Sequence, residues 1–182
     1  MRTAEEEDPI ISIVIPFFDS VDVLQRALRS VRDQDFAGSV QTIVVVDGLQ
    51  EDVSAVRAAF PSVVLIHQEN AGPGAARNRG IEIATGEFIA FLDADDGWLP
   101  TKLTVQIDAM RREEAAWSQH SYAVVDPDME VLRNVDTSRY SGNVLRDTLL
   151  SFRIQTSCVM VKRACLQDPD LRFGADRMGE DG

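Results

Sequence analysis

The stretch "NAGPGAARNRGIEIATGEFIAFLDADD" (residues 70–96) decides the fold, because it places a helix directly before a buried strand that ends in carboxylates. Gly72, Pro73 and Gly74 can begin the helix, and Gly86 can end it. The apolar run in "EFIAFLD" (87–93) has the length and composition of a strand buried on both faces. A helix followed by such a strand is typical of a parallel α/β sheet.

The same alternation extends in both directions from this stretch. Further strands are predicted at residues 10–18, 42–47 and 62–68, and further helices after Asp19 or Ser20, over 52–60 and from Pro100 onward. Beyond these, we predict a hairpin over 122–135 that turns at Asp126–Pro127–Asp128, a helix over 141–152 and a strand over 156–163. We therefore expect an α/β fold with a mostly parallel sheet flanked by helices and a small β-hairpin. Residues 1–9 would form an acidic tail and 10–182 one domain.

Composition excludes several classes of protein. The 182 residues are 45% hydrophobic and 26% charged, which is typical of one globular domain. A net charge of −12 argues against a nucleic-acid partner, because phosphate contacts need clustered Lys and Arg. No apolar run reaches the length of about 18 residues that predicts a membrane span. We expect a cytoplasmic protein, and peripheral contact with the inner face of the membrane is compatible with this.

Polar clusters follow three of the predicted elements at one edge of the predicted sheet. They are Asp47, the group Asp93, Asp95 and Asp96, and the glycine turn with Arg77 and Arg79. Mg²⁺ and Mn²⁺ prefer oxygen ligands and take one or two carboxylates alongside phosphate, while a glycine-rich helix start suits phosphate itself. Taken alone, the aspartate cluster and Asp47 are better explained as turn or cap residues, and the glycine turn is explained equally well as a helix cap. Because ligands bind beyond the carboxyl ends of parallel strands, their shared position favours a ligand site.

These segments, together with "ISIVIPFFD", "IVVVDG", "TSCVMVKR" and "GED", resemble the family 2 glycosyltransferases, which are inverting GT-A-fold enzymes that use nucleotide sugars. The resemblance implies that Asp47 holds the nucleobase, with Pro16 and Phe18 lining the nucleoside site. It implies that Arg77 contacts the nucleotide, that Asp93 reaches the ribose and donor sugar, and that Asp95 binds Mn²⁺ or Mg²⁺. It further implies Asp181 as the catalytic base, with Glu180 beside it.

The implied reaction moves a sugar from a nucleotide-sugar donor to a hydroxyl of a glycan, lipid-linked or small-molecule acceptor by single displacement. The expected donor is UDP-linked, although Val46 stands where the family commonly has a second Asp. The resemblance also implies an N-terminal catalytic region of a longer enzyme, hence a weakly active form. Two alternatives stay open. One is a non-catalytic nucleotide-sugar-binding domain. The other is a sugar-1-phosphate nucleotidyltransferase, which would carry a Gly-rich basic loop where this chain has "PFFDSVD".

Overall fold

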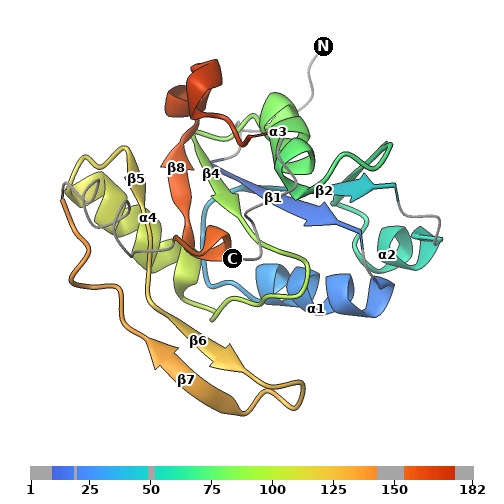
Figure 1. The fold of residues 1–182 in the computed structure, drawn as a ribbon, viewed down its shortest axis with the longest axis horizontal. Coiled ribbons are helices and arrows are strands. Elements are labelled where there is room, and N and C mark those ends of the chain that lie inside the picture. The colour runs from blue at the N-terminus through green and yellow to red at the C-terminus, as the bar shows by residue number, and fades with distance from the viewer. Residues whose placement is uncertain (1–9, 19, 49–51, 143–153, 175–182) are drawn as a thin grey trace.

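The computed structural model describes residues 10–18, 20–48, 52–142 and 154–174 (Figure 1). The strands are β1 Ile11–Phe17, β2 Val40–Asp47, β3 Val64–Gln68, β4 Phe88–Phe91, β5 Trp117–Ser118, β6 Tyr122–Val125, β7 Val131–Val135 and β8 Met160–Lys162. The α-helices are α1 Val21–Arg32, α2 Ser54–Ala59, α3 Pro73–Ile83 and α4 Lys102–Arg112. Three short 3₁₀ turns, η1 Thr156–Cys158, η2 Arg163–Gln167 and η3 Pro169–Leu171, flank β8.

Six strands form one sheet in the order β3-β2-β1-β4-β8-β5. The pairs β1–β2, β1–β4 and β2–β3 are parallel, whereas β8 runs antiparallel to both β4 and β5. The predicted mostly parallel sheet is therefore confirmed. The hairpin β6–β7 forms a separate two-stranded sheet that projects from the main body in Figure 1, which confirms the predicted excursion.

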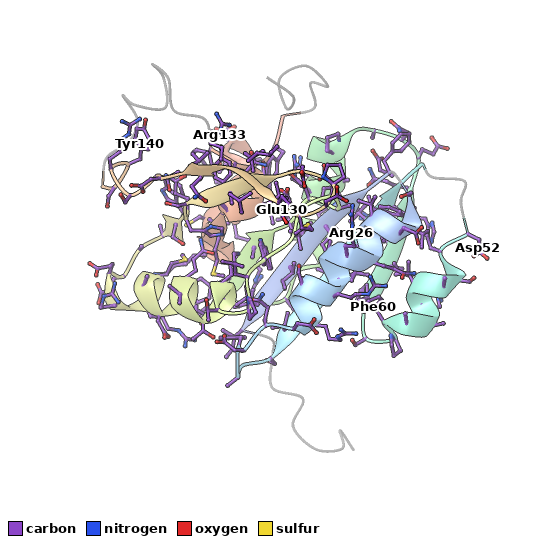
Figure 2. The ribbon with its side chains drawn as sticks, turned by 90° about the horizontal axis from the view of Figure 1, so that it is seen from below. Arg26, Asp52, Phe60, Glu130, Arg133 and Tyr140 are labelled. Carbon is purple, nitrogen blue, oxygen red and sulfur yellow. The ribbon has the colours of Figure 1, made fainter. Side chains whose placement is uncertain are left out.

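Apolar side chains of the central strands alternate between two cores. Ile13 and Ile15 of β1 pack into one core with α1, α2 and α4, whereas Val14 packs into the other with α3. Both faces of the central strands are covered, which is the reason these strands are mostly apolar, with the buried Ser12 of β1 as an exception. Figure 2 shows α1 and α2 along the same side of the sheet, with Phe60 at the end of α2 buried in their shared core.

Several predicted boundaries are wrong. The strand predicted over 156–163 begins with η1, and only Met160–Lys162 pairs with β4. The helix predicted from Pro100 begins at Lys102, because Thr101 is its N-cap residue, so Asp96 does not cap it. The helix predicted over 141–152 lies almost entirely outside the described residues. Within the described part of the chain, no helix is long and apolar enough to cross a membrane.

Candidate functional site

The three aspartates after β4 belong to a turn, residues 93–98, which we call the acidic turn. The backbone N–H of Asp96 donates to the carbonyl oxygen of Asp93 at 3.1 Å, which closes the turn. Asp95 is exposed to solvent, whereas Asp93 and Asp96 are half-buried. Trp98 ends the turn with its indole buried in the core. The turn therefore presents Asp95 outward from the carboxyl end of the central sheet.

Asp93 is held by Arg77 of α3. Arg77 Nη2 donates to Asp93 Oδ1 at 2.7 Å, and the arginine side chain is only 6% exposed. The guanidinium also lies over the ring of Phe173, 5.2 Å from its centroid. A buried guanidinium can donate two hydrogen bonds to a carboxylate, so that of Arg77 is well suited to fix the Asp93 carboxylate in one orientation. Arg79, by contrast, is exposed and pairs with Glu82 on the same helix, so it lies outside this cluster.

Asp47, at the end of β2, organises the glycine turn that leads into α3. Its Oδ1 accepts hydrogen bonds from Gln68 Nε2 and from the Ala71 N–H, and its Oδ2 accepts from the Gly72 N–H, all at 2.8 Å. Gly72 has φ 89°, a left-handed conformation that favours glycine. Two of the N–H groups expected to face phosphate therefore face this buried carboxylate.

Of the remaining predicted site residues, the structure describes Pro16 and Phe18 at the end of β1. Pro16 is buried within β1, and Phe18, one residue beyond the end of that strand, is 58% exposed. An exposed aromatic ring at a strand end is available to stack on a planar group. Asp181 and Glu180 lie outside the described residues.

Asp96 is the carboxylate of the turn that is turned toward protein. Burial raises its pKa, hydrogen bonds from the side chains of Ser157 and Gln155 oppose the rise, and repulsion from Asp93 and Asp95 adds to it. The Ser157 hydroxyl also accepts the N–H of Asp93 at 3.0 Å. Sequence reasoning missed Ser157, because nothing in "TSCVMVKR" distinguishes it from a strand residue.

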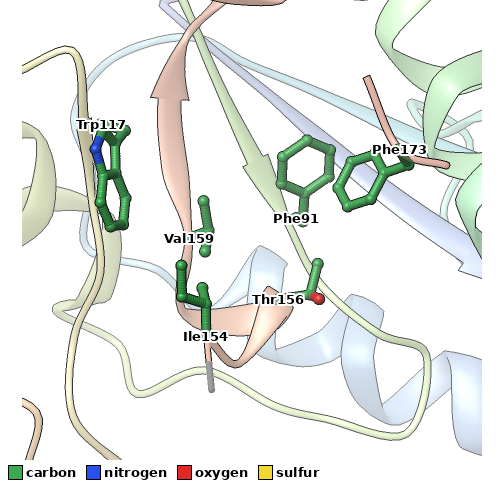
Figure 3. Close-up of a pocket in the computed structure, with 6 residues that line it drawn as sticks. All are labelled: Phe91, Trp117, Ile154, Thr156, Val159 and Phe173. Carbon is green, nitrogen blue, oxygen red and sulfur yellow. The ribbon is translucent and has the colours of Figure 1, made fainter. Parts of the chain in front are cut away.

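An apolar pocket of about 320 Å³ lies beside this cluster (Figure 3). Its lining residues are Phe91, Trp117, Ile154, Thr156, Val159 and Phe173. Phe173 meets Phe91 edge to face, with ring centroids 5.0 Å apart, and its ring also contacts Arg77. The pocket therefore shares a wall with the Arg77–Asp93 pair. No sequence pattern predicts it, because its lining residues come from distant segments.

The described residues suit a divalent cation only in partnership with a phosphate ligand. Among residues that the structure describes, no three His, Cys, Asp or Glu side chains converge to hold an ion by themselves. Mg²⁺ sites at nucleotides commonly use one or two carboxylates plus substrate phosphates. The exposed Asp95 beside the half-buried, arginine-held Asp93 fits that type of site.

Fold and site together define a GT-A-type α/β domain, with polar side chains of three elements gathered at the carboxyl ends of the parallel strands. The chain belongs to glycosyl transferase family 2, whose family model matches residues 12–167.

Known relatives and structures agree with this assignment. An uncharacterized glycosyltransferase of Rickettsia bellii is 30% identical over 176 residues, which cover 93% of this chain and 25% of the relative. The chain thus spans about a quarter of that relative's length. S. aureus TarS in complex with UDP superposes with a TM-score of 0.74 at 24% identity, over 94% of this chain and 52% of TarS. A mannosyltransferase from Pyrobaculum calidifontis, in complex with GDP-Man and Mn²⁺, superposes with a TM-score of 0.65 at 21% identity, over 94% of this chain and 49% of that one.

Proposed function

We propose that this chain carries the donor-binding part of an inverting glycosyltransferase that uses a UDP-linked sugar. The observation that carries the proposal is the exposed Asp95 next to the buried Arg77–Asp93 pair, at the edge of the sheet where ligands bind. UDP in the TarS structure and GDP-Man with Mn²⁺ in the mannosyltransferase structure support a nucleotide-sugar donor for this fold.

Each residue of the site has a role in this proposal. Phe18 stacks on the nucleobase, and Asp47 keeps one carboxylate lone pair for the base while it holds the glycine turn. Arg77 holds Asp93 toward the ribose and donor sugar. Asp95 would hold Mn²⁺ or Mg²⁺, and the chemistry that such an ion supplies is neutralisation of charge on the leaving diphosphate.

The acceptor hydroxyl must lose a proton as the new bond forms, and a carboxylate is the natural base for it. We propose Asp181 for this role, with Glu180 beside it. The acceptor is a glycan, lipid-linked or small-molecule hydroxyl compound, and the aromatic walls of the pocket at Phe91 and Phe173 are suited to a sugar ring or an apolar group of it. We propose the cytoplasm, at the inner face of the membrane, as the location of this reaction.

The first test measures which product is released. With UDP-sugars and Mn²⁺, a glycosyltransferase releases UDP, through transfer or slow hydrolysis. A nucleotidyltransferase would instead release pyrophosphate from UTP and a sugar 1-phosphate, and a non-catalytic binding domain would release neither. Pyrophosphate release, or donor binding without any turnover, would contradict the proposed activity.

Asp181→Asn tests the proposed base. Loss of a general base lowers turnover by about 10²- to 10⁴-fold, so transfer of the sugar to the acceptor, with the accompanying release of UDP, should fall by that factor while donor KM changes little. Asp170→Asn, at an exposed acid near the C-terminal end of the described residues, is the control and should retain wild-type turnover. Full activity in Asp181→Asn would show that another group is the base.

A further inference from the structure

Ser157 contacts the acidic turn at its beginning, middle and end. Its hydroxyl accepts the N–H of Asp93 at 3.0 Å. The same hydroxyl favours the charged form of the Asp96 carboxylate and so lowers the pKa of that group, against the effect of burial. Its backbone carbonyl oxygen accepts the indole Nε1–H of Trp98 at 2.8 Å. Ser157 is 5% exposed, so these contacts are made away from solvent. One buried residue of η1 therefore ties together a turn that lies about 60 residues away in the sequence.

The acidic turn needs such support because its own chemistry opposes a compact shape. Three carboxylates within four residues repel one another, and the repulsion strengthens where water is excluded. A serine hydroxyl can accept one hydrogen bond and donate another, so it can satisfy a backbone N–H and a carboxylate at once. Ser157 does both, on the two half-buried aspartates, and leaves the exposed Asp95 between them.

The segment around Ser157 is itself fixed from the side of α4. Gln106 Nε2 donates to the carbonyl oxygen of Cys158 at 2.9 Å, next to Ser157. The ammonium of Lys102 lies 3.7 Å from the centroid of the Trp98 ring. Trp98, 7% exposed, is thus held between α4 and η1. Both residues that anchor the turn, Ser157 and Trp98, are therefore buried.

We propose that Ser157 is the positioning residue of the acidic turn. Ser157 holds Asp93 and Asp96 in place so that Asp95 can bind a divalent cation together with the donor diphosphate. The inference rests on the proposed function for what Asp95 binds. Ser157 acts through the turn rather than by contact with the cation or the nucleotide. Residues that orient a metal-binding carboxylate commonly change metal affinity ten- to a hundredfold when they are replaced.

The test compares two buried serines. Ser157→Ala removes the hydroxyl from the acidic turn. Ser12→Ala is the matched control, because the Ser12 hydroxyl also accepts a backbone N–H, that of Gly86 at 2.9 Å, and donates to a side chain, Gln41, but lies near the start of β1, toward the opposite end of the strand from the site. Mn²⁺ affinity in the presence of UDP is measured from the free Mn²⁺ signal in electron paramagnetic resonance. We expect about a ten- to hundredfold loss in Ser157→Ala, less than a twofold change in Ser12→Ala, and recovery in Ser157→Thr, which restores the hydroxyl.

A second readout needs no ligand. Amide hydrogen exchange at Asp93 should accelerate in Ser157→Ala, because its N–H loses its acceptor, and should be unchanged in Ser12→Ala. If Ser157→Ala does not fold, Trp98→Phe removes the indole donor to Ser157 and should weaken Mn²⁺ affinity in the same direction.

The two proposals fail differently. Wild-type protein that binds no Mn²⁺ with UDP contradicts the proposed function, and the exchange measurement then decides on Ser157 alone. If Ser157→Ala binds Mn²⁺ as tightly as the wild type does, or if amide exchange at Asp93 is as slow in this variant as in the wild type, the positioning role of Ser157 is overturned.

Discussion

The position of Asp47 at the end of a strand was predicted correctly, but only part of its role was predicted. Its position at a strand end follows from the sequence, because the apolar run of β2 stops there. The three groups that donate hydrogen bonds to Asp47 cannot be predicted from the sequence. The turn with Ala71 and Gly72 lies next to Asp47 because β3, which precedes the turn, pairs with β2. The structure adds the role of organising the turn to the predicted role in base recognition.

Lys102 is a residue whose environment could not be read from the sequence. It precedes the apolar positions of α4 as a surface lysine would, yet its Nζ is buried and makes no hydrogen bond to any described residue. Burial lowers the pKa of its amine to about 7, with a small opposing effect of Cys158. The indole face of Trp98 attracts the charged form and also opposes the shift.

Lys102→Met should therefore stabilise the protein, and the gain should depend on pH. In the unfolded chain the amine keeps its ordinary pKa of 10.5, so between pH 7 and 10.5 the unfolded state binds more protons than the folded state. The stability of the wild type consequently rises with pH across this window. We expect Lys102→Met to gain on the order of a few kcal/mol in unfolding free energy at pH 6, and much less at pH 10.

Urea unfolding at pH 6, 8 and 10 measures this difference. Lys102→Arg is the control, because a guanidinium stays charged over the whole pH range. This variant should have a lower unfolding free energy than the wild type at every pH, and its unfolding free energy should not rise toward pH 10. If Lys102→Met gains the same unfolding free energy at pH 6 and at pH 10, the lowered pKa of the Lys102 amine is contradicted.

At the scale of elements, α3 is held against β1 by a glycine. A Cβ built on Gly80 would lie 2.3 Å from Cγ1 of Val14, which is fully buried in the central strand. This close contact brings α3, and with it Arg77, near the strand ends. The glycine is therefore a packing requirement within a helix in which alanine would otherwise be preferred.

Gly80→Ala should lower the unfolding free energy by about 1–3 kcal/mol, because overpacking at Val14 outweighs the better helix propensity of alanine. Chemical denaturation measures the change. The double variant Gly80→Ala with Val14→Ala makes room for the new methyl group, and the two substitutions should couple favourably in a double-mutant cycle. Additive effects of the two substitutions would show that the close contact is not what Gly80 provides.

The elements that could be predicted are those with a local signal. Short apolar runs predict β1, β2 and β4, and Asp126–Pro127–Asp128 predicts the turn of the hairpin. β5 has only Trp117 and Ser118, and it exists because it pairs with Val161 and Met160 of β8. Ser157 could not be assigned for the same reason, since its partners become neighbours only when β8 pairs with β4.

At the scale of the whole molecule, the parallel sheet brings three polar clusters to one edge. Asp47 joins the end of β2 to the start of α3, and Arg77 joins α3 to the end of β4. The order β3-β2-β1-β4 makes this convergence unavoidable, because the parallel strands end on the same side. This much of the site follows from the fold class that the sequence predicts. The turn η1, which leads into the antiparallel β8, then adds Ser157, and this contribution lies beyond that prediction.

The central claim is that Asp95 of the acidic turn binds a divalent cation together with a nucleoside diphosphate. The most direct measurement is calorimetric titration of UDP, with and without Mn²⁺, into the wild type, Asp95→Asn and the control Asp108→Asn, which removes another exposed acid, on α4. We predict that Mn²⁺ tightens UDP binding at least tenfold, about 1.4 kcal/mol, in the wild type and in Asp108→Asn, and that this tightening is lost in Asp95→Asn. Equal Mn²⁺-dependent binding in Asp95→Asn, or no UDP binding by the wild type, would contradict the claim.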